Sequence, residues 1–207
     1  MTKHNYTVPG INMLGTDRFI APSVIEKASH NMASIDIYSK LLTERIIYCT
    51  EEISPELSSD ITAALLYLDS LSHDPITLYI NSPGGCVSSG LAIIDTMNLI
   101  QSPVYTVCMG VAASMASLIL ASGEKGHRRS LKHGTVMIHQ PSTGIGYINT
   151  ADLEIEQKEM SRVKKVTFQV LADATGKTLK QIYKDADRNK WFDAEEALEY
   201  GLIDEII

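Results

Sequence analysis

Residues 76–85 read ITLYINSPGG, and this stretch decides the fold class. It begins as an apolar run with β-branched and aromatic residues, which is typical of a buried strand. It ends in Asn-Ser-Pro-Gly-Gly, which is typical of a tight turn. A helical pattern follows from about Val87 to Ile100, and Pro103 stops it. The stretch therefore predicts one complete β-α unit.

The same alternation of strand and helix continues on both sides of this unit. Predicted strands begin near Arg45, Ile76, Val104 and Thr135, with helical patterns in the segments between them. The strand from Val104 is expected to end at Met109. Buried strands that alternate with helices favour parallel pairing through right-handed crossovers. We therefore predict an α/β fold built from successive β-α units.

The helix after the first strand has a clear start and a clear apolar side. Ser54 supplies an N-cap, Pro55 occupies the first helical position and Glu56 places an acid in the first turn. Its apolar stripe consists of Leu57, Ile61, Ala64, Leu65 and Leu68. Because these residues recur at helical spacing, we expect this face of the helix to pack on the sheet.

Three more helices are predicted towards the C-terminus. The longest runs from Ala151 to about Asp173, and its apolar side suits either a core or an interface. It follows residues 141–150, PSTGIGYINT, which can form a projecting loop or an edge strand. Two short helices are expected within residues 178–187 and 193–201, the second with Asp193 as its N-cap.

Composition places the chain among single-domain proteins of the reducing cytosol. It has 207 residues, 44 % of them hydrophobic, which is enough for one substantial core. The net charge of −7 argues against binding of nucleic acid, because phosphates attract basic surfaces. Cys49, Cys86 and Cys108 are odd in number and form no C-x-x-C pair, so neither a disulfide framework nor a zinc site is indicated.

The N-terminal residues lack the periodicity of the rest. Residues 1–18 carry Asn, Thr, Pro and Gly and are expected to be a flexible segment or propeptide, followed by a single domain over residues 19–207. They contain no apolar stretch typical of a secretory signal, and the chain has no run of about 20 apolar residues. We therefore expect a cytoplasmic protein with no membrane association.

Residues 110–117, GVAASMAS, contain the first candidate for chemistry. Ser114 lies between a predicted strand and the start of a helical run that ends near Ala121, a position that favours developing negative charge. A small serine that merely packs there is the alternative interpretation. The stretch is not a G-x-S-x-G nucleophile elbow, because Ala112 and Ala116 occupy the two glycine positions.

His139 follows the next predicted strand at the equivalent end. It could simply cap the strand, but the ends of neighbouring parallel strands meet at one rim of a sheet, where open α/β folds place their sites. Gly84 and Gly85 end the preceding strand at the same rim. If this rim is a site, the N–H groups of Gly85 and Met115 are the natural oxyanion donors.

The sequence gives little indication of a metal site or a nucleotide-binding site. His127, His133 and His139 recur at a fixed interval. However, neither strand nor helix periodicity brings all three to one face together with an Asp or Glu that could complete a metal site. The chain also has no P-loop and no G-x-G-x-x-G sequence. We expect no metal and no cofactor.

The chain resembles the proteolytic subunits of the Clp protease, the ClpP family, from about Phe19 to Ile207. The motifs that carry the resemblance occur in the family's order: DIYSKLLTERII at 36–47, LYINSPGG at 78–85, CMGVAASMAS at 108–117, MIHQP at 137–141 and EYGLID at 199–204. The resemblance implies a crotonase-like (ClpP-type) spiral of β-α units with a projecting handle helix. The handle corresponds to residues of about 142–174.

The resemblance also implies a function, an assembly and a set of site residues. Family members are serine endopeptidases that form stacked heptameric rings and degrade unfolded proteins fed by a hexameric Clp ATPase, so ATP is used by the partner. Ser114 matches the nucleophile and His139 the general base, with oxyanion donors at Gly85 and Met115. Asp187 and Arg188 match a pair that links the two rings to the active site.

The main departure from the family is Asn189. Alignment on Trp191 and the sequence EEALEYGLID places Asn189 where the third triad member is usually aspartate. An asparagine oxygen can accept a hydrogen bond from the His139 ring, but it brings no negative charge to stabilise an imidazolium. We therefore expect weak activity from this chain alone.

Two further departures concern the partners. Thr77 occupies a position where the family commonly has an aromatic residue in the pocket that receives ATPase loops, and the sequence ends at Ile207 with almost no tail. Both predict weak docking. We hypothesise a variant that works in mixed rings with a second ClpP isoform. Alternatives are a mainly structural or regulatory ring subunit and a crotonase-type acyl-CoA enzyme, and the Ser-His pair disfavours the latter.

Overall fold

The computed structural model describes residues 22–27, 32–144 and 146–207. The chain divides into two compact units, of which the first ends at Lys40 and the second is Leu41–Ile207. The flexible segment expected over residues 1–18 lies outside the described residues. In the first unit, β1 (Ser23–Lys27) pairs with β2 (Met32–Asp36) in antiparallel fashion. Helix α1 (Ile37–Thr43) follows directly and contains the boundary between the two units.

The second unit is built on one seven-stranded sheet within the described residues. Its strands are β3 (Ile46–Cys49), β4 (Ile76–Ser82), β5 (Val104–Ala113), β6 (Arg128–Ser130), β7 (Thr135–Ile138), β8 (Lys190–Phe192) and β9 (Glu205–Ile206). The order is β3-β4-β5-β6-β9, and β7 pairs with both β5 and β8. These pairs are parallel except β7 with β8, so the predicted α/β fold of mainly parallel strands is confirmed.

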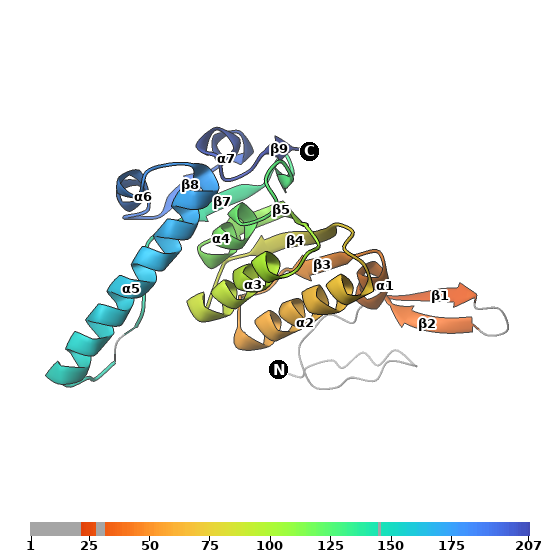
Figure 1. Cartoon of the computed structure of the whole chain (residues 1–207), viewed down its shortest axis with the longest axis horizontal. Coiled ribbons are helices and arrows are strands. Elements are labelled where there is room, and N and C mark those ends of the chain that lie inside the picture. Colours follow the sequence, from red (N-terminus) through yellow and green to blue (C-terminus); the bar gives the residue numbers. More distant parts are fainter. Residues whose placement is uncertain (1–21, 28–31, 145) are drawn as a thin grey trace, which may run out of the picture. The chain divides into compact units, whose positions relative to one another are not determined.

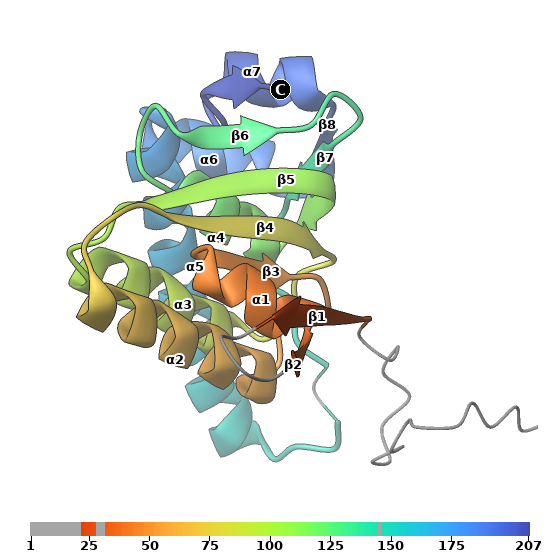
Figure 2. The ribbon, with the colours of Figure 1, turned by 90° about the vertical axis from the view of Figure 1, so that its right-hand side faces the viewer.

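Helices cover the sheet and extend past it. They are α2 (Pro55–Leu71), α3 (Val87–Leu99), α4 (Met115–Ala121), α5 (Thr150–Thr175), α6 (Leu179–Asp185) and α7 (Ala194–Tyr200). Figures 1 and 2 show α2, α3 and α4 side by side on one face of the sheet. The core lies between them and the strands, where Leu65, Ile80 and Ile119 are fully buried.

The predicted helix starts are confirmed at the atomic level. The Leu57 N–H donates to the Ser54 hydroxyl at 3.2 Å, and Ile61, Leu65 and Leu68 of the predicted stripe are buried. At α7, Asp193 and Glu196 form a reciprocal capping box, as expected for an acid at the N-cap with a glutamate three residues later.

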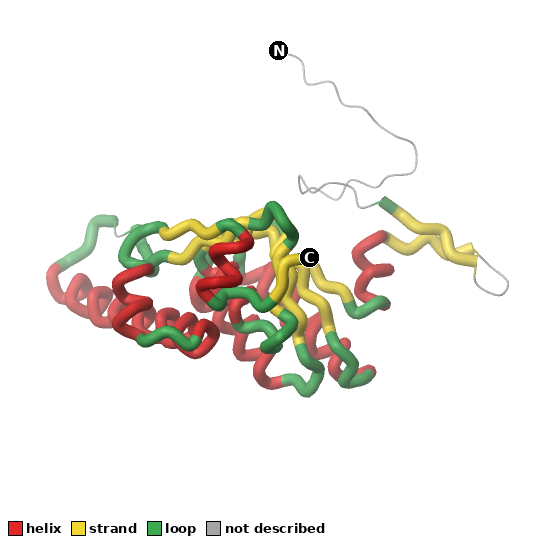
Figure 3. Tube along the Cα trace, turned by 90° about the horizontal axis from the view of Figure 1, so that it is seen from above, coloured by secondary structure: helices red, strands yellow, loops and turns green. Residues whose placement is uncertain are grey.

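The long helix α5 begins one residue before its predicted start and ends at Thr175, because the following Gly176 adopts a left-handed conformation (φ 71°). Its last turns are buried at Phe168 and Leu171, whereas residues 150–159 are exposed. Figures 1 and 3 show this exposed half extending away from the sheet, in agreement with the expected handle helix. The described residues of 141–150 contain no strand, so the loop interpretation is correct there.

Two features of the sheet differ from the prediction. The strand from Val104 was expected to end at Met109 but continues to Ala113, because Gly110 (φ 100°) lets the chain bulge and resume pairing. Strands β6, β8 and β9 were not predicted, since two or three residues are too few to show a period. Both differences matter for the site, because β5 leads directly into Ser114 and β8 starts directly after Asn189.

Candidate active site

Ser114 lies in the sharp turn between β5 and α4. Its backbone is held at φ 55° and ψ −125°, a conformation that non-glycine residues rarely adopt and that is found at functional sites. The Ser114 N–H donates to the Met137 carbonyl at 2.8 Å, and its own carbonyl accepts from the Ser117 hydroxyl at 2.6 Å. These bonds hold the strained turn between β7 and the first turn of α4.

Close contact with the Ser114 segment explains why glycine occupies position 84 in the turn after β4. A Cβ placed on Gly84 would lie 2.7 Å from the Ser114 Cβ, 2.6 Å from the Ala113 carbonyl oxygen and 2.9 Å from the Met115 nitrogen. Gly84 also has φ 94°, which other residues rarely adopt. Only glycine therefore allows the turn after β4 to pack on the backbone of Ser114.

The antiparallel pairing of β7 and β8 brings His139 and Asn189 together. In this register Ile138, the last residue of β7, lies opposite Lys190, the first residue of β8. His139, which follows Ile138, and Asn189, which precedes Lys190, are therefore neighbours. The His139 Nδ1 is 3.0 Å from the Asn189 Oδ1, and the His139 Nε2 is 2.8 Å from the Ser114 Oγ. We call this continuous line of Ser114, His139 and Asn189 the hydrogen-bonded triad.

The line has one consistent assignment of protons. If the Ser114 hydroxyl donates to Nε2, the neutral imidazole carries its proton on Nδ1, and Nδ1–H donates to the Asn189 carbonyl oxygen. His139 and Ser114 are half-buried, whereas Asn189 is exposed. The arrangement can take a proton from the serine hydroxyl, although no carboxylate lies at the Asn189 position to stabilise the resulting cation.

The two expected oxyanion donors lie beside this turn. Gly85 forms an isolated parallel bridge with Ile53, in which the Ile53 N–H donates to the Gly84 carbonyl and the Cys86 N–H to the Ile53 carbonyl, both at 2.8 Å. Across the part of the chain that the structure describes, the Gly85 and Met115 N–H groups donate to no protein acceptor.

A hollow of about 520 Å³ lies between α5 and the two residues that follow His139 in the chain. Gln140 and Pro141, which follow His139 in the chain, form one wall, and α5 forms the other with residues that include Leu153, Met160 and Lys164. Polar and charged residues, among them Glu156 and Gln157, line the hollow together with the apolar ones.

Asp187 and Arg188, the expected ring-contact residues, lie apart from the triad line. They belong to residues 186–189, which connect α6 to β8 and which we call the Asn189 loop. Their side chains are 61 % and 90 % exposed, and the 3.8 Å between the Arg188 Nε and the Asp187 carboxylate is a loose ion pair. Such exposure leaves both side chains available for a partner.

Sequence reasoning did not identify Gln140, which contacts the Asn189 loop, or Lys164, which contacts Gln140. The Lys164 ammonium donates to the Gln140 Oε1 at 2.7 Å, and the Gln140 Nε2 donates to the Asp187 carbonyl at 2.8 Å. These contacts join residues far apart in the chain, so no local pattern reveals them. Only the position of Gln140 directly after His139 could have drawn attention to it.

The described residues form neither a metal-binding cluster nor a membrane-spanning helix. Within residues 22–27, 32–144 and 146–207, no group of three or more His, Cys, Asp and Glu side chains could hold a metal ion. His127, His133 and His139 are thus not part of such a group. No helix in these ranges is long and apolar enough to cross a membrane.

Comparison with known proteins gives consistent matches along the chain. A family model described as Clp protease matches residues 29–207. An "ATP-dependent Clp protease proteolytic subunit" of Streptococcus mutans is 48 % identical over 188 residues, which is 90 % of this chain and 96 % of the relative. The corresponding subunit 1 of Salinibacter ruber is 46 % identical over 91 % of this chain and 81 % of the relative. The Lactococcus lactis subunit is 46 % identical over 191 residues.

Proposed function

The chain belongs to the Clp protease family, and from this membership we propose that it is the proteolytic subunit of an ATP-dependent Clp protease and acts as a serine endopeptidase. One observation carries the serine mechanism: the unbroken hydrogen-bonded triad, with 2.8 Å from the Ser114 Oγ to the His139 Nε2 and 3.0 Å from Nδ1 to the Asn189 Oδ1. Nucleophile, base and orienting group within hydrogen-bond reach are what such chemistry requires.

In the proposed reaction Ser114 is the nucleophile and His139 the general base. As the Ser114 Oγ attacks the peptide carbonyl carbon, its proton moves to the His139 Nε2, and the carbonyl oxygen becomes an oxyanion. His139 then donates this proton to the leaving amine, so that the C–N bond breaks and an acyl-enzyme remains. Water, activated by the same imidazole, hydrolyses the ester and restores the hydroxyl.

We propose the N–H groups of Gly85 and Met115 as the oxyanion donors. Their support is that both lie on the segments that meet at Ser114 and that both lack a protein acceptor among the residues described. Met115 also occupies the first position of α4, where the backbone carries partial positive charge. Pre-positioned donors of this kind stabilise the charge that develops in the transition state.

Asn189 is proposed to keep the geometry of His139 while it lowers the rate. Its amide oxygen orients the ring, but a neutral dipole stabilises the imidazolium much less than a carboxylate does. The corresponding Asp-to-Asn change in serine proteases costs about 10⁴ in rate, which bounds the loss expected here. The chain alone is thus a weak peptidase.

The proposed assembly is two stacked heptameric rings in the cytoplasm, with a hexameric Clp ATPase that delivers unfolded protein substrates. The projecting half of α5 and the exposed pair Asp187 and Arg188 are the proposed ring–ring contacts. Thr77 on β4, in place of an aromatic residue, is proposed to weaken ATPase docking. Mixed rings with a second isoform of full activity would compensate for both departures.

A mainly structural or regulatory role in mixed rings is the second candidate. The observation that favours it is the neutral and exposed Asn189 at the third position of the triad. The intact contact between Ser114 and His139 favours the enzymatic role instead. The two candidates differ in whether this chain hydrolyses peptides by itself.

Hydrolysis of a short fluorogenic peptide by the purified chain tests the proposal. We would compare the wild type with Ser114→Ala and Asn189→Asp and measure the oligomer mass of each sample. We expect slow hydrolysis by the wild type, no hydrolysis by Ser114→Ala, and a rate at least tenfold higher for Asn189→Asp at unchanged mass.

The outcomes separate the candidates. If Ser114→Ala hydrolyses the peptide as fast as the wild type, the serine mechanism is wrong. If neither the wild type nor Asn189→Asp is active although both assemble, the structural role is favoured. If this chain alone degrades an ATPase-delivered protein as fast as a conventional subunit does, weak docking and mixed rings are excluded.

A further inference from the structure

We propose that Lys164 and Gln140 are positioning residues that hold the Asn189 loop against His139, so that helix α5 controls the geometry of the triad. This inference rests on the proposed serine mechanism and assigns to the handle helix an intramolecular role. The juxtaposition that carries it is a chain of contacts from the Lys164 ammonium through the Gln140 amide to the Asp187 backbone.

The Gln140 side chain uses both ends of its amide in this chain. Its Oε1 accepts from the Lys164 Nζ at 2.7 Å, and its Nε2 donates to the Asp187 carbonyl at 2.8 Å. Lysine can only donate and a carbonyl can only accept, so the amide has a single consistent orientation. Because Gln140 follows His139 directly and Asp187 lies two residues before Asn189, the bridge links the two partners of the 3.0 Å Nδ1–Oδ1 contact.

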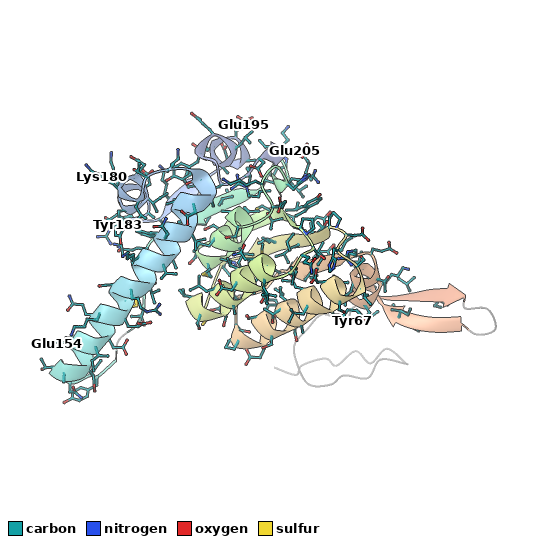
Figure 4. All side chains as sticks on the ribbon, in the orientation of Figure 1. Tyr67, Glu154, Lys180, Tyr183, Glu195 and Glu205 are labelled. Atoms are coloured by element: carbon teal, nitrogen blue, oxygen red, sulfur yellow. The ribbon has the colours of Figure 1, made fainter. Side chains whose placement is uncertain are left out.

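Lys164 is itself held in place by aromatic rings. Its ammonium lies 5.4 Å from the ring centroid of Phe168 and 5.3 Å from that of Tyr183, within the range of a cation–π contact. The two rings meet edge to face at 4.8 Å, and Phe168 is fully buried. Tyr183 belongs to α6, the helix that leads into the Asn189 loop (Figure 4). Lys164 therefore joins α5 to α6, which leads into that loop, and to Gln140, which contacts it.

Without Gln140, the Asn189 loop is held mainly at its base. There the Lys190 ammonium lies 3.2 Å from the Asp185 carboxylate, which also accepts from the Tyr200 hydroxyl at 2.8 Å. This pair closes the loop at its two ends but leaves the backbone at its tip, where Asp187 is exposed, without a strand partner. The Gln140 contact supplies the restraint at the tip.

An asparagine triad depends on such a restraint more than an aspartate triad does. A hydrogen bond between a neutral amide and a neutral imidazole is weak and directional, whereas a carboxylate attracts the imidazolium over a wider range of positions. Loss of the Lys164 contact should therefore matter most when residue 189 is asparagine. This dependence distinguishes positioning through Asn189 from a general effect on the fold.

The test compares Lys164→Met with Lys165→Met in the assembled protein. Methionine keeps much of the apolar stem of Lys164 but cannot donate to Gln140, and exposed Lys165 is the matched control one residue further along α5. We expect Lys164→Met to lower kcat about tenfold with KM within roughly twofold, and Lys165→Met to change neither. Lys164→Met should also slow the labelling of Ser114 by a small fluorophosphonate to a similar extent. Because this reagent is not a peptide, slower labelling cannot be explained by weaker peptide binding.

Two further backgrounds make the test decisive. In Asn189→Ala, Lys164→Met should cause no additional loss, and in Asn189→Asp its effect should shrink to about threefold or less. The same loss in all three backgrounds, or a rise in KM at constant kcat, would overturn the proposal in favour of a structural or substrate-binding role.

A second variant covers the case in which Lys164→Met does not assemble. Gln140→Glu keeps an oxygen for Lys164 but replaces the donor to the Asp187 carbonyl, so it should lower kcat as Lys164→Met does. An unchanged kcat in Gln140→Glu contradicts the proposal. Ser114→Ala distinguishes the two levels of inference, because residual activity there refutes the serine mechanism, whereas full activity of Lys164→Met refutes only the positioning role.

Discussion

The two ends of the hydrogen-bonded triad are built in opposite ways. Ser114 is held by the Met137 carbonyl and the Ser117 hydroxyl inside a packed region, where Ala113, Met115 and Ala116 are at most 3 % exposed. Asn189 lies on an exposed loop that side chains hold in place, chiefly Gln140. The position of the nucleophile is thus fixed by packing in the core, whereas the position of the orienting group depends on a few contacts at the surface.

The difference shows where activity can change without loss of the fold. A substitution near Ser114 meets backbone atoms and must disturb the strands, since protein interiors are close-packed. A substitution in or near the Asn189 loop removes a contact that stabilises little of the core. Replacement of a family aspartate by asparagine at this end is therefore compatible with an intact sheet, and each prediction below tests the contrast.

The largest effect is expected at the packed end, from Gly84→Ala. The new methyl group would lie 2.6–2.9 Å from the Ala113 oxygen, the Ser114 Cβ and the Met115 nitrogen, so the turn of Ser114 must shift. We expect a loss of peptidase activity of at least about 100-fold and a destabilisation of about 1–3 kcal/mol. Steady-state hydrolysis and thermal unfolding measure both, with Gly144→Ala, which meets no atom within 4 Å, as the control. Full activity of Gly84→Ala would show that the segment around Ser114 accommodates an added methyl group, and would contradict this prediction.

A smaller effect is expected at the base of the Asn189 loop, from Asp185→Asn. The change removes the charge that holds Lys190 at 3.2 Å but keeps an oxygen for the Tyr200 hydroxyl. We expect kcat to fall about threefold to tenfold while the oligomer mass is unchanged. Asp173→Asn, at an exposed carboxylate of α5, serves as the control. An effect as large as that of Gly84→Ala would remove the contrast between the two ends.

The same carboxylate predicts a dependence of stability on pH. Burial alone raises the pKa of Asp185, but hydrogen bonds from Gln181, Tyr200 and Lys190 outweigh it, so the pKa lies below its usual value of 3.8. Its contribution to stability is therefore fully present above about pH 4 and is lost as the pH falls through the lowered pKa. We expect acidification from pH 5 to pH 3 to lower Tm in the wild type by about 2 °C more than in Asp185→Asn. Equal shifts in both proteins would contradict this assignment.

The smallest effect concerns the reactivity of the three cysteines, which reports on the packing around the nucleophile end of the triad. Cys86 follows Gly85 and is exposed, and hydrogen bonds from Ser88 and Ser89 lower the pKa of its thiol to about 7. Burial raises the pKa of the Cys49 and Cys108 thiols to about 11. Iodoacetamide at neutral pH should thus modify Cys86 alone, with a rate that rises around pH 7. Peptide mapping by mass spectrometry reads the result, and modification of Cys49 in the folded protein would show that the core opens.

Much of the fold could be predicted from local patterns. The N-caps at Ser54 and Asp193 and the turn at Gly84 are local signals, and each lies where the structure has the corresponding helix start or turn. The end of β5 was misplaced because Gly110 reads locally as a terminator, whereas pairing with neighbouring strands carries the chain on to Ala113. Pairing is a non-local property that one segment does not reveal.

The sequence by itself determined the alternation of strands and helices and the residue types at the rim. Ser114 and His139 could be singled out because each follows a predicted strand, and Asn189 through its resemblance to a family motif. Periodicity and capping act within a few residues of the chain, so they are readable without a structure.

Only the tertiary structure decided how these residues meet. The β7–β8 register sets His139 against Asn189, and the bridge from Lys164 through Gln140 joins α5 to the loop. Gln140 and Asp187 are 47 positions apart in the chain, and no short-range rule relates such residues. Contacts of this kind depend on close packing of the whole unit, which fixes distances that local propensity leaves open.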